Sequence, residues 1–249
     1  MGETSKTADQ ALTVLLELVD HGPLTAAELA RRLELNRTVV HRLLATLHSR
    51  GFITRHGHDY APGALLVRIA ERVRPELRAA ASGVMARLSK DIGETVILHI
   101  PDGDDALVLE QCAAAQHVVR VEHEIGSRHP LSLGASGRAM LAYLPHTVIE
   151  RLVRKAERPE RLRHQLEAVT QLGYALSHDE LQHGVHGLAV PVLDASGHAL
   201  ASLAIIVPAA RTDGLIDHLD PLRRAAADVS ASLYGGEPQP ATISSSTRG

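Results

Sequence analysis

The sequence of 249 residues contains a single cysteine, Cys112, and no apolar run that approaches the roughly 20 residues needed to span a bilayer. One cysteine can form no internal disulfide and cannot by itself supply a structural zinc site. The opening residues MGETSKTADQ also lack the basic and apolar regions of a signal peptide. We therefore expect a cytoplasmic protein that makes no contact with a membrane.

A strong excess of charge of either sign is also missing, because 26 lysines and arginines face 29 acidic residues for a formal net charge of −3. Hydrophobic residues make up 45% of the chain, which is typical of a globular protein rather than a disordered or membrane protein. The length exceeds that of one small domain. We expect two domains.

Although the net charge is small, charge is distributed unevenly along the chain. Residues 31–58 contain six arginines and one acidic residue, Glu34, and four histidines in the same stretch can add positive charge. A local net charge of +5 is what contact with a phosphate backbone favours. A basic helix face that is merely solvated is the alternative that charge alone leaves open.

The N-terminal part of the sequence predicts three helices. Apolar residues at helical spacing indicate the first, from about Lys6 to His21. Thr25, with Glu28 three residues later, forms a capping-box pattern at the start of a short second helix. Asn36 suits the cap of a third helix that runs to about Ser49. Two short helices joined by about three or four residues are typical of a helix-turn-helix.

The third predicted helix has two different faces. One face is apolar and consists of Val39, Val40, Leu43, Leu44 and Leu47. The opposite face is polar and basic, and consists of Thr38, His41, Arg42 and the small residue Ala45. The second face suits a helix in the major groove of DNA, where Arg and His side chains reach base edges or phosphates.

Residues 52–60 alternate around a central glycine and predict a two-stranded hairpin, or wing. Arg55, His56 and His58 lie at its tip, where a wing meets phosphate or the minor groove. An exposed loop without a binding role is the alternative for each of these residues.

The remaining sequence predicts a second domain that begins near residues 74–78. Helices are expected at 63–73, from Pro75 to about Lys90, and at 136–143, 159–172 and 215–234, and strands at 95–100, 106–111, 117–122, 187–193 and 198–207. Antiparallel hairpins mixed with helices make this domain α+β. The tail from Gly235 is rich in Gly, Pro, Ser and Thr, and we expect it to be disordered.

Four stretches of the sequence together carry a resemblance to a known family. They are LTAAELARRLELNRTVVHRLLATLHSRGFITR, IGETVILHI, HPLSLGASGRAMLAYL and LGYALSHDELQHGVHGLAVPVLDASGHALASLAIIVP. In this order, between about Ala8 and Pro208, they resemble segments of the IclR family of bacterial transcription regulators.

The resemblance implies a fold and a function for each domain. The expected fold is α+β, with a winged helix-turn-helix at residues 1–62, a linker helix at 63–76, an effector-binding domain with a GAF-like or profilin-like antiparallel sheet at 77–234, and a disordered tail at 235–249. Family members act as homodimers or dimers of dimers on palindromic operators. The implied protein is a DNA-binding regulator, with repression as the expected mode, and it has no catalytic residue, no cofactor and no metal site.

The resemblance also indicates which residues contact double-stranded DNA. They are Thr25, Asn36, Arg37, Thr38, His41 and Arg42 in the helix-turn-helix, and Arg55, His56 and His58 in the wing. Family members commonly have Ser-Thr where this chain has Thr38-Val39, so one hydrogen bond expected from the family is missing.

The effector site implied by the resemblance is a cavity. Its residues are Gly134, Ala135, Ser136, Ser177, Gly187, Ala204 and Ile206. Members that bind small oxygenated acids often carry Asp, Cys or Ser at four of these positions, so we expect a more apolar cavity here. The predicted effector is a partly apolar or aromatic organic acid, with its carboxylate at the free backbone N–H groups that start the helix at Gly134.

Three other functions compete with this interpretation. A metal sensor or a metal-dependent enzyme could use the ionisable cluster of His178, Asp179, Glu180, His183 and His186. The spacing of the cluster fits no zincin motif, and GASG lacks the nucleophile-elbow pattern G-x-S-x-G. A winged helix used only for protein contact is the third alternative, against which the excess of arginine in residues 31–58 argues.

Overall fold

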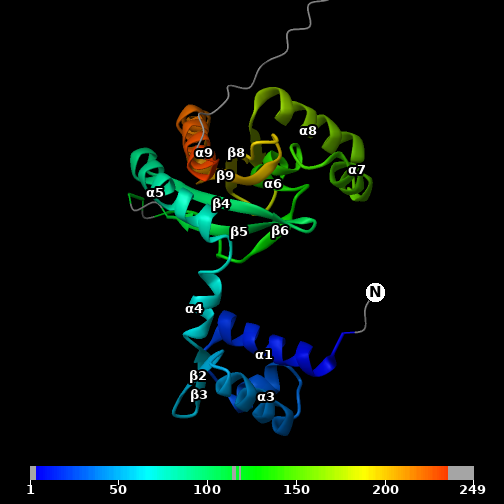
Figure 1. Cartoon of the computed structure of the whole chain (residues 1–249), viewed down its shortest axis with the longest axis vertical. Coiled ribbons are helices and arrows are strands. Elements are labelled where there is room, and N and C mark those ends of the chain that lie inside the picture. Colours follow the sequence, from blue (N-terminus) through cyan, green and yellow to red (C-terminus); the bar gives the residue numbers. More distant parts are fainter. Residues whose placement is uncertain (1–3, 114–115, 118, 235–249) are drawn as a thin grey trace, which may run out of the picture. The chain divides into compact units, whose positions relative to one another are not determined.

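The computed structural model describes residues 4–113, 116–117 and 119–234, and it divides between Pro75 and Glu76 into two compact units (Figure 1). The predicted disordered tail at 235–249 lies outside the described residues. No helix in the described part of the chain is long and apolar enough to cross a membrane.

The first unit is a winged helix-turn-helix, as predicted (Figure 1). Its elements are α1 (Lys6–His21), β1 (Leu24–Thr25), α2 (Ala26–Arg32), α3 (Arg37–Ser49), β2 (Ile53–His56), β3 (Asp59–Pro62) and α4 (Leu65–Ala70). The three strands form an antiparallel sheet in the order β1-β3-β2.

Capping side chains set the starts of α2 and α3. The Thr25 hydroxyl accepts a hydrogen bond from the Glu28 N–H at 3.2 Å, and the Glu28 carboxylate accepts one from the Thr25 N–H at 2.8 Å. The Asn36 side-chain oxygen accepts one from the Thr38 N–H at 2.8 Å. These contacts satisfy N–H groups that a helix start leaves without partners. The predicted capping box and cap are confirmed.

The core of the first unit explains how α3 is oriented. Val40, Leu43, Leu44 and Leu47 are buried on one side of α3, where they pack in one cluster with residues of α1 and α2 such as Leu18. The predicted apolar face is therefore confirmed, and Val39 at its margin is partly buried. Burial of this face leaves the opposite face of α3 at the surface of the unit.

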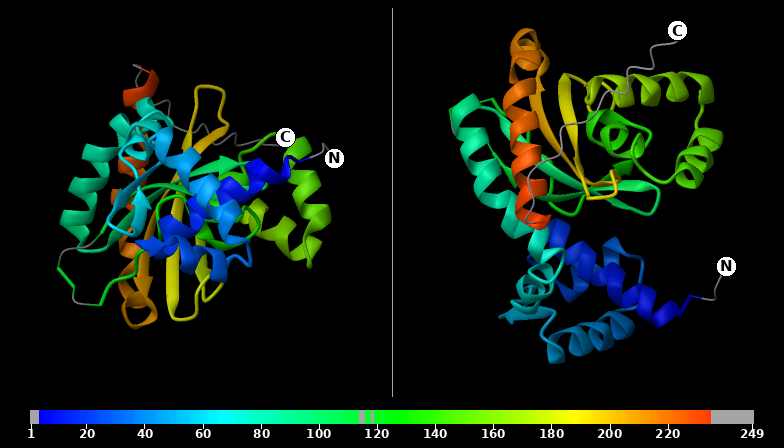
Figure 2. Two further views of the ribbon diagram at one scale, coloured as in Figure 1. Left: turned by 90° about the horizontal axis from the view of Figure 1, so that it is seen from below. Right: turned by 45° about the horizontal axis from the view of Figure 1, so that its top comes forward.

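The second unit is an α+β domain built on one antiparallel sheet (Figures 1 and 2). Its elements are α5 (Pro75–Ile92), β4 (Thr95–Asp102), β5 (Asp105–Cys112), β6 (Arg128–Pro130), α6 (Gly134–Leu141), α7 (His146–Lys155), α8 (Pro159–Leu172), β7 (Ala175–His178), β8 (Val185–Leu193), β9 (Ala199–Pro208), the 3-10 segment η1 (Ala209–His218) and α9 (Leu219–Tyr234). The six strands follow the order β6-β5-β4-β9-β8-β7.

Alternation along the strands sends side chains to two different layers. On β4, Val96, Leu98 and Ile100 join the main hydrophobic cluster with residues of α5 and α9. Ile97 and His99, between them in sequence, project to the other face, on which α6 lies. In both figures α5 and α9 lie side by side on one face of the sheet, and α6, α7 and α8 lie on the other.

The strand predicted at residues 117–122 is wrong. The structure describes His117 and residues 119–122 of that stretch, and none of these lies in a strand. The outer edge of β5 pairs instead with β6, where Leu107 lies opposite Arg128, and the Val108 N–H donates to the Ser127 carbonyl at 3.0 Å. The backbone groups of Leu107 and Val108 are therefore not available to the predicted strand.

Two predicted helices are shorter than expected. The helix expected at 63–73 is the six-residue α4, which buries none of its residues, and Pro75 disfavours helical backbone at Arg74, where φ is +49°. The helix expected at 215–234 begins at Leu219, because η1 forms a separate turn before it. The helix α7 and the strand β7 were not predicted as elements.

Candidate functional sites

The basic face of α3 lies open to solvent. Arg37, Thr38, His41 and Arg42 are exposed, and Ala45 on the same face is exposed as well. The capping residue Asn36 precedes them at the start of the helix. An exposed helix with small, polar and basic side chains has the shape and charge that a major groove accepts.

The two capping residues named as DNA contacts have their side chains engaged in the fold. The Thr25 hydroxyl donates to the Glu28 carboxylate at 2.7 Å in addition to its role as acceptor, and the Asn36 side-chain oxygen is held by the Thr38 N–H. The backbone hydrogen bond and the side-chain hydrogen bond with Thr25 lower the pKa of Glu28. Both residues therefore fix the starts of α2 and α3.

The wing is the hairpin of β2 and β3, and its tip carries three of the predicted contacts. Gly57 adopts φ +64°, a conformation that favours glycine, at the turn. His56 and His58 are exposed beside it. Arg55 folds back on the hairpin, because its Nε donates to the Gly57 carbonyl at 2.8 Å and its guanidinium lies 5.6 Å from the centre of the Tyr60 ring.

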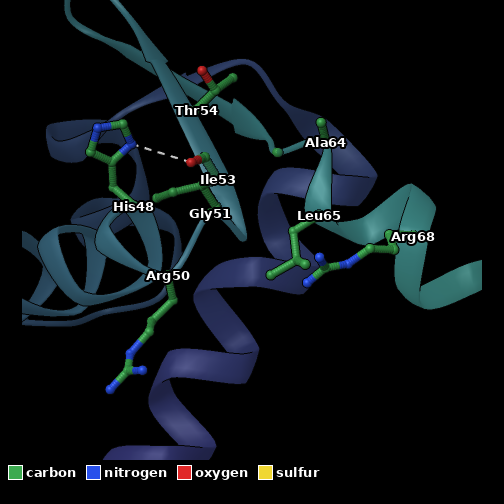
Figure 3. A pocket seen from close by; sticks show the side chains of 9 residues that line it. His48, Arg50, Gly51, Ile53, Thr54, Ala64, Leu65 and Arg68 are labelled. Carbon is green, nitrogen blue, oxygen red and sulfur yellow. Dashed lines mark hydrogen bonds between the residues drawn. The ribbon is translucent and has the colours of Figure 1, made fainter.

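A broad hollow with a volume of about 590 Å³ lies at the base of the wing (Figure 3). Arg50, Leu65 and Arg68 contribute to its wall, and the His48 ring N–H donates to the Ile53 carbonyl at 3.2 Å beside it. The hollow is open, whereas a small-molecule site encloses most of its ligand. It also contains none of the residues that the sequence indicated for an effector site.

An enclosed cavity lies in the second unit between α6 and the sheet. Six of the seven predicted effector residues line it, namely Ala135, Ser136, Ser177, Gly187, Ala204 and Ile206, and the seventh, Gly134, is the first residue of α6. Its volume is about 20 Å³, which holds about one water molecule. The structure therefore shows the cavity in a closed form.

Five further residues line the cavity and were not predicted. They are His99, His123, Leu181, Gln182 and Val185. Leu181 and Gln182 belong to the segment between β7 and β8, and His99 belongs to the centre of β4. The one sequence signal for His99 is a polar residue inside the otherwise apolar strand VILHI.

His99 is an unusual polar side chain because it is only 1% exposed and neither ring nitrogen has a hydrogen-bond partner among the described residues. The rings of His123 and His129 lie nearby, with centroids 6.3 Å and 5.4 Å from that of His99. Burial lowers the pKa of all three imidazoles, and for His99 the pKa falls well below its usual range. At neutral pH His99 is therefore uncharged. A buried polar group without a partner costs about 1–3 kcal/mol of stability.

His129 differs from His99 because both of its ring nitrogens have partners. Its Nδ1–H donates to the Pro130 carbonyl at 3.2 Å, and its Nε2 accepts from the Ser136 hydroxyl at 3.2 Å. We assign this tautomer because a carbonyl oxygen can only accept a hydrogen bond. His129 is thus satisfied as a neutral ring, and it positions the Ser136 hydroxyl at the start of α6.

The expectation that the N–H of Gly134 is free for a ligand is wrong. It donates to Glu180 at 3.0 Å, and Glu180 also pairs through both carboxylate oxygens with Arg138, whose side chain is only 4% exposed. Burial raises the pKa of Glu180, but hydrogen bonding to Arg138, the charge of Arg138 and the Gly134 N–H outweigh it and hold the pKa below its usual range. A helix start attracts anions, and here the chain supplies the anion itself.

In the ionisable cluster at residues 178–186, Asp179 lies 3.6 Å from His183 Nδ1 and 3.6 Å from His186 Nε2, whereas Glu180 pairs with Arg138. The β7–β8 register places His178 opposite His186, with ring centroids 4.6 Å apart, and His186 Nδ1 bonds to Thr212 at 2.6 Å. His183 extends fully into solvent. In the part of the chain that the structure describes, no group of three or more His, Cys, Asp or Glu residues could hold a metal ion. The geometry gives no support to the metal alternatives.

Comparison with known proteins identifies the family. The model of the bacterial transcriptional regulator IclR C-terminal domain matches residues 73–231, which is more than half of the chain. The chain belongs to the IclR family. A MarR family model matches residues 7–60, over the winged helix-turn-helix. The IclR-family chain is therefore a DNA-binding transcriptional regulator rather than an enzyme.

Curated relatives agree with this assignment. The HTH-type transcriptional regulator KipR of Bacillus subtilis is 30% identical over 219 residues, which cover 82% of this chain and 87% of the relative. The Pca regulon regulatory protein of Pseudomonas putida is 29% identical, with 73% of this chain and 67% of the relative covered.

Solved structures of IclR proteins share the fold. The IclR protein of Thermotoga maritima has a TM-score of 0.78 at 24% identity and covers 91% of this chain and 98% of its own. An IclR homologue of Microbacterium hydrocarbonoxydans, solved in complex with 4-hydroxybenzoate, has a TM-score of 0.81 at 23% identity and covers 93% of this chain and 100% of its own. The α+β architecture of this IclR-family protein is confirmed by these likenesses.

Proposed function

We propose that this IclR-family regulator is a repressor whose affinity for its operator changes when a partly apolar, aromatic carboxylate binds in the cavity beneath α6. The observation that carries the proposal is the lining of the cavity. Ala135, Gly187, Ala204 and Ile206 present apolar surface, and Ser136, Ser177 and two histidines supply a few polar groups. A mostly apolar wall with a few convergent polar groups is typical of sites for small organic ligands.

The closed cavity must enlarge to admit such a ligand. A volume of about 20 Å³ excludes an aromatic ring. Leu181 lies against the start of α6, where its Cδ1 would be 2.8 Å from a Cβ placed on Gly134, and it is partly exposed. We propose that the segment with Leu181 and Gln182 moves to open the cavity. The 4-hydroxybenzoate complex of the Microbacterium relative supports an aromatic acid as the ligand class.

The proposed DNA contacts are on α3 and the wing of the segment 1–62. Arg37, Thr38, His41 and Arg42 supply the groove and phosphate contacts, while Thr25 and Asn36 present the helix starts and Arg55, His56 and His58 form the wing contact. The exposure of the α3 face and the local excess of positive charge support this assignment. The segment 63–76 then serves as the linker, and 77–234 as the effector domain. Because the family is bacterial and its target is DNA, the proposed location is the cytoplasm.

A homodimer, or a dimer of dimers, on a palindromic operator completes the proposal. Leu12 and Leu16, 59% and 60% exposed, and Val19 form an apolar stripe along α1 at helical spacing. Val67 and Ile69 are exposed on α4. Contiguous exposed apolar residues mark surfaces that bind other proteins, and a second copy of the chain presents the same stripe.

The proposed function is tested by a thermal-shift screen with the full chain. The panel contains benzoate, 4-hydroxybenzoate, 3,4-dihydroxybenzoate and phenylacetate, with glyoxylate and pyruvate as small polar acids. A ligand at about 100 times its dissociation constant adds about 2.7 kcal/mol to the free energy of unfolding. We expect a shift with at least one aromatic acid. Stabilisation by glyoxylate or pyruvate and by none of the aromatic acids contradicts the proposed ligand class.

A further inference from the structure

The polar side chain that faces the cavity from the sheet is His99, and this inference about it rests on the proposed function. His99 lies at the centre of β4, and it lines the cavity with Ala135, Ser177 and Ile206. It is almost completely buried, and both ring nitrogens are without partners among the described residues. A buried polar group left unsatisfied in this way calls for a partner that the chain itself does not supply.

A second unpartnered polar group lies on the neighbouring strand. Ser202 of β9 is directly opposite His99 in the antiparallel register, is fully buried, and has no hydrogen-bond partner for its hydroxyl among the described residues. Side chains opposite each other in such a pair have Cβ atoms about 5 Å apart and point to the same face of the sheet. The two strands therefore present an imidazole and a hydroxyl side by side, and neither group is used by the fold.

The other histidines near the cavity are less available. His129 uses both ring nitrogens, for the Pro130 carbonyl and the Ser136 hydroxyl. The backbone of His123 is tied to the Gln111 side chain at 2.7 Å, and its ring is only partly buried. Because the His123 ring is partly exposed, solvent can satisfy its nitrogens. Of these three histidines, His99 is therefore the one whose ring nitrogens are satisfied neither by the described residues nor by solvent.

We propose that His99 binds the carboxylate of the effector as an imidazolium, so that each bound acid brings one proton from solvent into the cavity. The proton goes to a ring nitrogen of His99, and the ligand remains a carboxylate. No other bond forms or breaks. Ser202 lies beside His99 but does not line the cavity in its closed form. Once the cavity has opened, its hydroxyl donates a second hydrogen bond to the same carboxylate.

The charges around His99 determine the direction of the proton transfer. In the closed cavity burial keeps the ring neutral, and the positive forms of His129 and His123 would lower the pKa of His99 further. Asp105 acts on His129, and on α6 the charge of Glu180 is balanced by Arg138. Burial, His129 and His123 act on the pKa of His99, and all three lower it, so a carboxylate that enters the cavity brings a negative charge beside the ring and raises its pKa.

The proton is counted by isothermal titration calorimetry with the full wild-type chain. 4-Hydroxybenzoate and benzoate are titrated at neutral pH in two buffers that differ in ionisation enthalpy. We expect uptake of about one proton for each acid bound, and a dissociation constant that rises up to about tenfold for each unit of pH as the pH increases. The uncharged analogue 4-hydroxybenzamide controls for burial of the ring and is expected to bind without proton uptake.

The variant His99→Gln keeps a polar side chain that cannot be charged. We expect it to bind the two acids about tenfold to hundredfold more weakly, which corresponds to the loss of one charge-assisted hydrogen bond. Binding of the acids should occur without proton uptake. The dissociation constant for 4-hydroxybenzamide should change little. His164→Gln, on an exposed part of α8, is the matched control and is expected to behave as wild type.

The outcomes separate this inference from the proposed function. Tight binding of the aromatic acids with no proton uptake, and equal binding by His99→Gln, overturns the role of His99 and leaves the effector class intact. Failure of every aromatic acid in the panel to bind the wild-type chain overturns the proposed function itself. If His99→Gln does not fold, the proton count on the wild-type chain decides the matter alone.

Discussion

The substitution Gly187→Ala tests the cavity directly, because a single methyl group would enter it. A Cβ on Gly187 would lie 2.9 Å from Ser177 Oγ and 3.6 Å from the Ala135 Cβ, and the backbone at this position has no positive φ that would exclude alanine. The Ser177 hydroxyl can rotate away from the new methyl group. We therefore expect a folded protein whose free energy of unfolding is within about 1 kcal/mol of wild type.

The effect on the ligand is expected to be larger. A methyl group in a site with a closed volume of about 20 Å³ removes room that the aromatic ring needs. Overpacking of about 1–3 kcal/mol weakens binding of 4-hydroxybenzoate by about fivefold to hundredfold. Calorimetry measures the dissociation constant, and operator binding without the acid is expected to stay at the wild-type level.

The matched control is Gly83→Ala on α5 in the same unit. A Cβ there would meet only Arg87 Nη1, at 3.6 Å, and alanine favours a helix more than glycine by about 1 kcal/mol. Binding of the acid is expected to be unchanged in this variant. If Gly187→Ala bound 4-hydroxybenzoate as tightly as Gly83→Ala and wild type, the ligand would have to lie outside the cavity, contrary to the proposed site.

Three further predictions concern the fold and the DNA surface. Asn36→Ala removes the cap of α3 and is expected to lower the free energy of unfolding by about 0.5–2 kcal/mol in denaturant titrations, and an unchanged midpoint would contradict the capping role. Arg42→Ala is expected to weaken operator binding and to reduce the slope of log affinity against log salt by about one per subunit, while the exposed Arg224 gives a control variant without effect. Glu180→Gln leaves the buried guanidinium beside it without its carboxylate and is expected to lower the free energy of unfolding at neutral pH by about 2–4 kcal/mol. The pKa of Glu180 is lowered in the folded state, so the wild-type ion pair contributes stability above the unfolded pKa of about 4.3 and loses it as the pH falls through the folded pKa. The variant should therefore lose less stability than wild type on acidification. Equal losses would contradict the pairing.

The winged helix-turn-helix was predictable because residues close in the sequence determine where its helices and strands begin and end. Thr25 and Asn36 cap helices, Gly57 forms a turn, and the apolar spacing on α3 determines which face is buried. Each of these effects acts within a few residues of its cause. The elements of the second unit that depend on partners distant in the sequence were harder to predict. The edge of β5 could pair with either of two later segments, and only the fold shows that it takes β6.

The cavity was predictable only through the family resemblance, which supplied residues from α6, β7, β8 and β9. His99 escaped prediction because its role depends on three facts absent from the linear sequence, namely the face of β4 to which it points, its burial, and the register that places Ser202 opposite it. Glu180 was considered only as part of an ionisable cluster, and its partners were not predicted, since Arg138 and the Gly134 N–H lie 42 and 46 residues away in the sequence. Long-range contacts of this kind are what sequence periodicity does not encode.

In the proposed function, a small acid in the cavity changes the affinity of the α3 face for DNA. The most direct test measures, by fluorescence anisotropy, the dissociation constant of the full chain for the DNA upstream of its own gene, with and without a saturating aromatic acid identified by calorimetry. We expect salt-dependent binding that the acid shifts by about fivefold or more, the range of typical allosteric coupling. An acid that saturates the cavity and leaves the dissociation constant for DNA unchanged would contradict the proposed coupling between effector and operator binding.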